Sequence, residues 1–94
     1  MAISFIGGGV MAEALIKGII NSGISNSKNI KVSEPLVGRC SYLESEYGIT
    51  TVRKNRDLID NDGLLVLSVK PQTLPQVYSD LSGKIKHGRS VVSI

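Results

Sequence analysis

The sequence predicts an α/β fold in which a parallel sheet carries helices on both faces. Short apolar runs alternate with segments whose apolar residues recur at helical spacing, which indicates strand–helix repeats. The run LLVLSV at residues 64–69 is apolar almost throughout, as is typical of a parallel strand that helices cover on both faces. A glycine-rich turn at residues 7–9 joins the first strand to the first helix. With right-handed crossovers, we predict one sheet with the strand order 3-2-1-4-5.

Five strands are expected along the chain, with helices between them. The strands are residues 3–6, 29–33, 49–52, 64–69 and 91–94. Each helical segment is expected to end at a glycine, which readily adopts the left-handed conformation at that position; these are Gly23, Gly48 and Gly83. Asn55 is expected to cap a short turn that contains Leu58 and Ile59.

The helical segments have apolar faces that identify the candidate core. Their residues are Met11, Ala12, Leu15, Ile16, Ile19 and Ile20 in the first, Leu36, Cys40, Leu43 and Tyr47 in the second, and Leu74, Val77, Tyr78 and Leu81 in the third. Thr73 is expected to cap the third helix, with Pro75 in its first turn. Glu13 and Lys17 stand four residues apart on the polar face of the first helix, so we expect them to pair.

The glycine-rich turn carries the clearest functional signal. Gly7, Gly9 and Ala12 fit the dinucleotide fingerprint G-x-G-x-x-G/A, which needs small residues for the sharp turn, the approach of the diphosphate and helix packing. The N–H groups and positive end of the following helix would hold the diphosphate. An ordinary strand-to-helix turn would also contain glycines, but this motif follows a strand and opens an amphipathic helix. We therefore predict a Rossmann-like dinucleotide-binding domain over residues 1–94.

Residues after the second strand indicate which nicotinamide cofactor is bound. Ser33 and Arg39 offer hydrogen-bond donors to the 2′-phosphate of NADP, whereas an acidic residue suits the 2′-hydroxyl of NAD. Glu34 would repel the phosphate if it pointed inward, and we expect it instead to be a solvated loop residue beside Pro35. NADPH is therefore predicted in preference to NADH.

The end of the fourth strand is expected to face the fingerprint across the crevice. Residues 68–71 read Ser-Val-Lys-Pro, and their backbone groups are candidates to hold the nicotinamide ribose. Lys70 either donates to the cofactor or is a solvated charge, and Pro71 biases it to an extended conformation. Asn55, besides capping its turn, is expected on the adenosine side of the crevice.

The composition excludes several other classes of protein. The net charge is +3, but the basic residues are scattered and the four aromatic residues are too few for a base-stacking surface, so no nucleic-acid partner is expected. No apolar run approaches the roughly 20 residues that span a bilayer, so we expect a soluble, cytoplasmic protein with no membrane partner. Cys40 is the only cysteine and is expected to be a core residue, with no disulfide and no metal site.

Four stretches carry a resemblance to a known family. IGGGVMAEALIKG, VSEP, LSVKPQTLPQV and VVSI, in this order and spacing, resemble the amino-terminal part of pyrroline-5-carboxylate reductase. The resemblance extends over essentially the whole chain, and the combination of MAEA with VKPQ is its most specific part. It implies that cofactor-contacting positions are Ile6, Gly7, Gly8, Gly9, Val10, Met11, Ser33, Asn55, Ser68, Val69, Lys70 and Pro71. Gly8 departs from the family, which often has alanine there.

The resemblance implies an enzyme that reduces a cyclic imine to proline by hydride transfer from NADPH, as a homo-oligomer when complete. It also implies that this chain is a fragment without the helical dimerisation and substrate domain, and inactive alone. None of the residues present is a convincing general acid, so no catalytic residue is predicted. Two alternatives stay open: a non-catalytic dinucleotide-binding module or redox sensor, and a related β-hydroxyacid or deazaflavin-type dehydrogenase.

Overall fold

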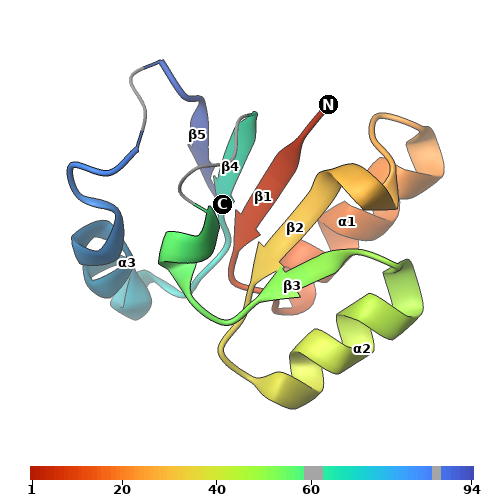
Figure 1. The fold of residues 1–94 in the computed structure, drawn as a ribbon, viewed down its shortest axis with the longest axis horizontal. Coiled ribbons are helices and arrows are strands. Elements are labelled where there is room, and N and C mark those ends of the chain that lie inside the picture. Colours follow the sequence, from red (N-terminus) through yellow and green to blue (C-terminus); the bar gives the residue numbers. More distant parts are fainter. Residues whose placement is uncertain (59–62, 86–87) are drawn as a thin grey trace.

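The computed structural model describes residues 1–58, 63–85 and 88–94 as one parallel sheet with helices on both faces (Figure 1). The strands are β1 (Ile3–Ile6), β2 (Ile30–Ser33), β3 (Thr50–Val52), β4 (Leu64–Leu67) and β5 (Val91–Ser93). The α-helices are α1 (Val10–Ser22), α2 (Val37–Tyr47) and α3 (Leu74–Leu81). Three single-turn 3₁₀ helices connect them: η1 (Ser27–Asn29), η2 (Asn55–Leu58) and η3 (Pro71–Thr73).

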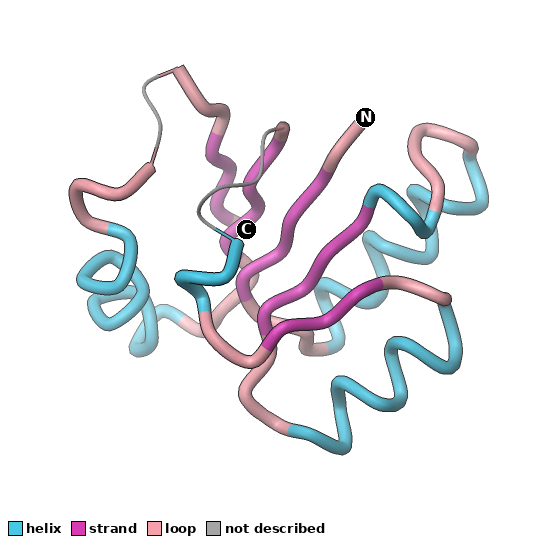
Figure 2. The backbone as a smooth tube through the Cα atoms, in the orientation of Figure 1, coloured by secondary structure: helices cyan, strands magenta, loops and turns pink. Residues whose placement is uncertain are grey.

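The strand order β3-β2-β1-β4-β5 confirms the predicted topology. All four pairings are parallel, and β1 lies at the centre with Phe5 opposite both Val32 of β2 and Val66 of β4. The crossover from β3 to β4 passes over β1 and β2, so the chain changes direction between β1 and β4. In an open parallel sheet this point leaves a crevice at the carboxyl ends of the two strands. Figure 2 shows the loops that follow β1, β2, β3 and β4 gathered at that edge.

Two apolar clusters lie on opposite faces of the sheet. On one face, α1 and α2 bury Ala12, Ile16 and Leu43 against β1 and β2. On the other face, α3 and η2 bury Val77, Leu81 and Leu58 against β1 and β4. Burial of each such side chain contributes about 1.5–3 kcal/mol, which makes these two clusters the main source of stability. Because both faces of β4 are covered, this strand is apolar along nearly its whole length.

Some expected element boundaries and core positions are wrong. Strand β4 ends at Leu67 rather than at residue 69, because the chain turns there toward η3. Met11, Leu15, Leu36 and Tyr78 are exposed, although their spacing placed them on apolar helix faces. Thr73 makes no side-chain cap, because it already has right-handed helical backbone angles at the end of η3. Ile59 and the middle of the basic connector at residues 84–89 lie outside the described residues.

The helix ends agree better with the expectations. Gly23 and Gly48 adopt left-handed angles directly after α1 and α2, and each donates its N–H to a carbonyl of the last helical turn. Cys40 is buried in α2 with its thiol 3.1 Å from the carbonyl oxygen of Glu34, in keeping with its predicted place in the core. The expected turn is present as η2, but Asn55 is its first residue and does not cap it, because its side chain is bonded to Ser33 and Asp80.

Candidate cofactor-binding site

The turn between β1 and α1 is held against the ends of both neighbouring strands. The N–H of Gly7 donates to the carbonyl of Ser33 at the end of β2 (2.9 Å). On the other side, the Ser68 hydroxyl lies 3.0 Å from the carbonyl oxygen of Ile6 and 2.8 Å from that of Gly7. A Cβ at Gly7 would meet the Ser68 carbonyl oxygen at 2.5 Å, and the φ angle of Gly7 is +100°. Glycine is therefore required here both by the backbone conformation and by the close approach of β4.

Gly9 has a different environment, because it faces open space. It is the residue before the first turn of α1, its φ angle is −79°, and no heavy atom lies within 4 Å of a Cβ built on it. The first N–H that donates into the helix is that of Glu13, to the Gly9 carbonyl. The N–H groups of Val10, Met11 and Ala12 therefore have no intrahelical acceptor and stand at the positive end of the helix. This combination of space and free donors fits a dinucleotide diphosphate.

Gly8 is buried between these two glycines and is bonded to side chains at both its backbone groups. Its N–H donates to Oε1 of Glu34 (2.9 Å), and its carbonyl accepts from Nε of Arg39 (2.5 Å). The second carboxylate oxygen of Glu34 accepts the N–H of Leu36 (3.0 Å). The expectation that Glu34 is solvated is wrong, because two backbone donors hold its carboxylate in a site where the residue is only 7% exposed.

Arg39 is also held by α1, which bears on its predicted role. Its terminal nitrogen lies 2.7 Å from Glu13, and its guanidinium stands 5.1 Å from the centre of the Tyr42 ring. The hydroxyls of Tyr42 and Tyr47 both donate to the other carboxylate oxygen of Glu13. Glu13 thus pairs with these α2 residues. The expectation that it pairs with Lys17 is wrong. The guanidinium predicted to meet a 2′-phosphate already has two partners.

The partners of Glu13 change how it titrates. Hydrogen bonds from Tyr47, then Tyr42, then Arg39 lower the pKa of Glu13 to about 2. Because Tyr47 and Tyr42 each donate a hydrogen bond to the Glu13 carboxylate, the pKa values of both tyrosine hydroxyls are raised. Glu13 is therefore ionised and both tyrosines are protonated throughout the physiological range.

A chain of polar side chains links the ends of β2 and β3 to α3. Ser33, which is buried, donates through its hydroxyl to Oδ1 of Asn55 (2.6 Å). The Asn55 amide donates to Asp80 (3.1 Å), which also accepts from Gln76 one helical turn earlier (2.9 Å). The structure thus brings together Ser33 and Asn55, two of the predicted cofactor-binding residues.

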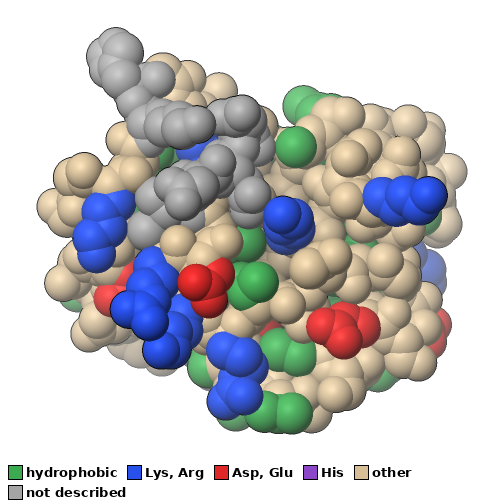
Figure 3. All heavy atoms as spheres, in the orientation of Figure 1, with side chains coloured by type: hydrophobic (Ala, Val, Ile, Leu, Met, Phe, Trp, Pro, Cys, Tyr) green, Lys and Arg blue, Asp and Glu red, His purple; other side chains and the backbone are tan. Residues whose placement is uncertain are grey.

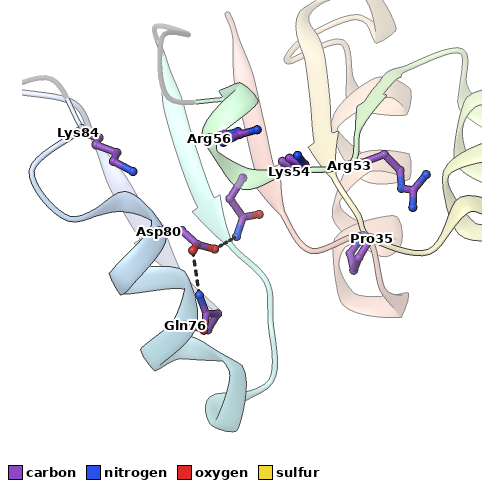
Figure 4. Close-up of a pocket in the computed structure, with 8 residues that line it drawn as sticks. Pro35, Arg53, Lys54, Arg56, Gln76, Asp80 and Lys84 are labelled. Carbon is purple, nitrogen blue, oxygen red and sulfur yellow. Dashed lines mark hydrogen bonds between the residues drawn. The ribbon is translucent and has the colours of Figure 1, made fainter.

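A basic pocket of about 570 Å³ lies beside the hydrogen-bonded side chains of Ser33, Asn55 and Asp80. Figure 4 shows that Arg53, Lys54 and Arg56 come from the segment after β3, whereas Gln76, Asp80 and Lys84 come from α3 and the turn after it. Pro35 and Asn55 complete the lining. On the face seen in Figure 3, basic side chains gather around an acidic one in the region between α3 and β3. The lining contains four cationic side chains and one carboxylate, so the pocket favours an anion.

The segment after β4 divides into two parts. Val69 packs against the apolar cluster under α3, while Lys70 and Pro71 are exposed at the start of η3. On the fingerprint side, Ile6 is buried in the sheet, and Val10 and Met11 expose their side chains beside Gly9. The predicted positions therefore line one edge of the sheet, from the end of β4 through the glycine turn to β3.

Sequence reasoning missed Glu34 as a buried partner of Gly8 and missed the basic pocket. The pocket had a visible signal, since three of the four residues in RKNR, residues 53–56, are basic and directly follow a strand. Glu34 had none, because its orientation depends on a hydrogen bond to a residue 26 positions away. Among residues 1–58, 63–85 and 88–94, no group of three or more His, Cys, Asp or Glu side chains is arranged to hold a metal. No helix in that part of the chain is long and apolar enough to cross a membrane.

Comparisons with known proteins agree with this geometry. A pyrroline-5-carboxylate reductase from Methanosarcina acetivorans is 37% identical over 92 residues, which are 98% of this chain and 34% of the relative. The corresponding protein of Synechocystis is 36% identical over 81 residues, 86% of this chain and 30% of the relative. The chain therefore spans about a third of the length of these curated relatives.

A solved structure and a family description complete the comparison. The structure of a pyrroline-5-carboxylate reductase from Coxiella burnetii superposes with a TM-score of 0.88 at 29% identity, over 98% of this chain and 34% of that one. Residues 2–94 match a family described as "NADP oxidoreductase coenzyme F420-dependent", whose members are oxidoreductases that bind a nicotinamide dinucleotide. Since the match covers nearly every residue, the chain belongs to the family of coenzyme F420-dependent NADP oxidoreductases.

Proposed function

We propose that this chain is the NADPH-binding domain of a pyrroline-5-carboxylate reductase, which reduces a cyclic imine to proline. The observation that carries the proposal is the open space at Gly9, bordered by the free N–H groups that begin α1. The diphosphate occupies this space and accepts from the N–H groups of Val10 and Met11. The similarity to curated reductases over 98% of the chain supports the choice of reaction.

The preference for NADPH rests on the pocket beyond β3, because Glu34, although it points inward, has its carboxylate engaged by the N–H groups of Gly8 and Leu36. Ser33 and Asn55, which lie together at the ends of β2 and β3, would hold the adenosine ribose of a bound cofactor. The basic pocket adjoins Asn55, and the side chains of Arg53, Lys54 and Arg56 have no hydrogen-bond or ion-pair partner in the described part of the chain. A 2′-phosphate supplies that partner, whereas the 2′-hydroxyl of NADH does not. These three residues take the role first assigned to Arg39.

Calorimetric titration with NADPH and NADH tests this assignment. We expect wild type to bind NADPH more tightly, and Arg53→Met or Arg56→Met to weaken NADPH on the order of tenfold, about 1.4 kcal/mol. NADH affinity should stay unchanged, and the loss should shrink at high salt because these side chains are exposed. Lys28→Met serves as the matched control, since η1 lies at the opposite edge of the sheet. Equal losses for both cofactors, or a preference for NADH, would overturn the assignment.

The nicotinamide ring of the bound cofactor supplies the hydride. The residues of this chain bind and orient the cofactor, since held orientation of the reactants can provide about 7–11 kcal/mol of the barrier. Val69 and the backbone around Lys70 form the wall on the nicotinamide side of the crevice. No residue of the chain is assigned to the imine or to proton transfer.

The activity is tested by NADPH oxidation in the protein that contains this chain. Turnover with pyrroline-5-carboxylate supports the reductase. Oxidation of NADPH with a deazaflavin and not with the imine would instead support the branch that the family description names. Cofactor binding without either reaction would support a non-catalytic dinucleotide-binding module.

A further inference from the structure

Gly8 is fixed by the segment that follows β2. Its N–H and carbonyl point to Glu34 and Arg39, which lie five residues apart, one at the strand end and the other in the first turn of α2. Each of these side chains is itself anchored, Glu34 by the N–H of Leu36 and Arg39 by Glu13 of α1. The hydrogen bonds thus form a clamp on Gly8, which we define as the side chains of Glu34 and Arg39.

Because the clamp occupies both backbone groups of Gly8, neither group is free to bind a ligand. The N–H of Gly8 is used by a carboxylate, so it is not free for a diphosphate. The residue is tightly packed between α2 and β2, since a Cβ built on it would lie 2.9 Å from Leu43 and 3.1 Å from Val32. Fixing Gly8 determines the direction in which Gly9 and the first N–H groups of α1 point.

We propose that Glu34 and Arg39 are positioning residues that order the glycine turn for dinucleotide binding and make no contact with the cofactor. This inference rests on the proposed function and changes the role predicted for Arg39. Three consecutive glycines have large conformational freedom, which binding must remove unless the fold has already removed it. The clamp therefore raises affinity for NADPH and NADH by the same factor, whereas a residue at the 2′-phosphate affects NADPH alone.

The Glu13 cluster determines how firmly Arg39 is held. Tyr42 and Tyr47 occupy one carboxylate oxygen of Glu13, which leaves the other to face the guanidinium at 2.7 Å. The guanidinium is planar and offers separate donors, so Nε can reach the Gly8 carbonyl while a terminal nitrogen reaches Glu13. A lysine in this position has one ammonium and cannot occupy both places.

The test compares Arg39→Met and Arg39→Lys with wild type by titration with NADPH and NADH. Both variants should weaken both cofactors by the same factor, roughly 5- to 30-fold, with the ratio of the two affinities unchanged. Arg53→Met is the contrasting variant, expected to lower NADPH affinity alone. Arg39→Lys also covers the case in which Arg39→Met fails to fold. A loss confined to NADPH, or no loss with either cofactor, would overturn the proposal.

A second measurement separates this proposal from the proposed function. Amide hydrogen exchange of the ligand-free protein reports the Gly8 N–H directly, without any cofactor. We expect slow exchange in wild type and clearly faster exchange in Glu34→Gln and Arg39→Lys, while the core amide of Val32 stays protected. If wild type binds neither cofactor, the proposed function fails, yet this exchange pattern still supports the clamp. Unchanged Gly8 exchange in both variants would overturn it.

Discussion

Gly7 and Gly9 stand two residues apart and lack a side chain for different reasons. Gly7 has a positive φ angle and touches the end of β4, so its small size serves the fold. Gly9 has an ordinary φ angle and no heavy atom within 4 Å of a Cβ built on it, so the fold does not require its small size, and the proposed diphosphate would. The fingerprint pattern names both residues, but only their surroundings distinguish the two roles.

This difference leads to a paired prediction. Gly9→Val should fold normally and lose NADPH binding, because its branched side chain occupies the space for the diphosphate. Gly7→Ala should lose at least about 1–3 kcal/mol of stability, since it combines backbone strain with a steric clash. Circular dichroism melting and calorimetric titration measure the two effects. A Gly9→Val protein that binds NADPH as wild type does would contradict the assigned diphosphate position.

Glu13 makes the free energy of unfolding depend on pH in the acidic range. Its pKa in the folded protein is about 2, against an ordinary value of 4.5, because three side chains donate to its carboxylate. A lowered folded-state pKa gives a contribution that is complete above about pH 4.5 and is lost as the pH falls toward 2. Glu13→Gln removes this titration.

The free-energy gap between wild type and Glu13→Gln should therefore narrow as the pH falls from 5 to 3. Urea unfolding of both proteins over this range measures the gap. A gap for Glu13→Gln that stays constant with pH would show that the hydrogen bonds to Glu13 do not persist in solution.

Helix α2 shows what a periodic pattern can and cannot predict. Leu36, Cys40, Leu43 and Tyr47 recur at helical spacing, and the helix they predict is present and ends at Gly48. Leu36 is nevertheless 67% exposed while Leu43 is fully buried. Leu36 precedes the first residue of α2 and has extended backbone angles, so it lies outside the helix whose apolar face it was expected to share. Met11 and Leu15 lie within α1 but are exposed, because burial depends on which part of a helical face another element covers.

Two substitutions, one in α2 and one just before it, test this difference in burial. Leu43→Ala should reduce the free energy of unfolding by about 2–5 kcal/mol, because it leaves a cavity beneath the glycine turn. Leu36→Ala should change it by no more than about 0.5 kcal/mol, as is usual for an exposed position. Chemical denaturation of the two variants gives both values. Equal losses would mean that Leu36 is buried in solution.

For the whole molecule, the strand order followed from local features alone. The glycine turn after β1, the apolar run of β4 and the strand–helix alternation leave few topologies open once crossovers are right-handed. Ser33 and Asn55 could be placed near the ligand because parallel strands end at one edge. The partners of Glu34, Arg39 and Asp80 could not be predicted, since each is a side-chain contact between elements more than 20 residues apart.

The site is consequently divided among four segments that only the folded sheet brings together. Under the proposed function, the glycine turn would hold the diphosphate, the ends of β2 and β3 would hold the adenosine end, and the end of β4 would border the nicotinamide. In this proposal the basic pocket would bind the 2′-phosphate directly, whereas the clamp would act only by fixing the backbone of Gly8. A single binding event should therefore affect residues from all four segments.

The most direct measurement is a map of backbone amide chemical shifts as NADPH is added to the isotopically labelled chain. We predict the largest changes at Gly9, Val10 and Met11, with further changes at Asn55 and Arg56 that are weaker or absent with NADH. Residues 20–29, at the opposite edge of the sheet, should not respond. Shifts confined to that opposite edge, or none at saturating NADPH, would contradict the account that this chain binds NADPH across its glycine turn.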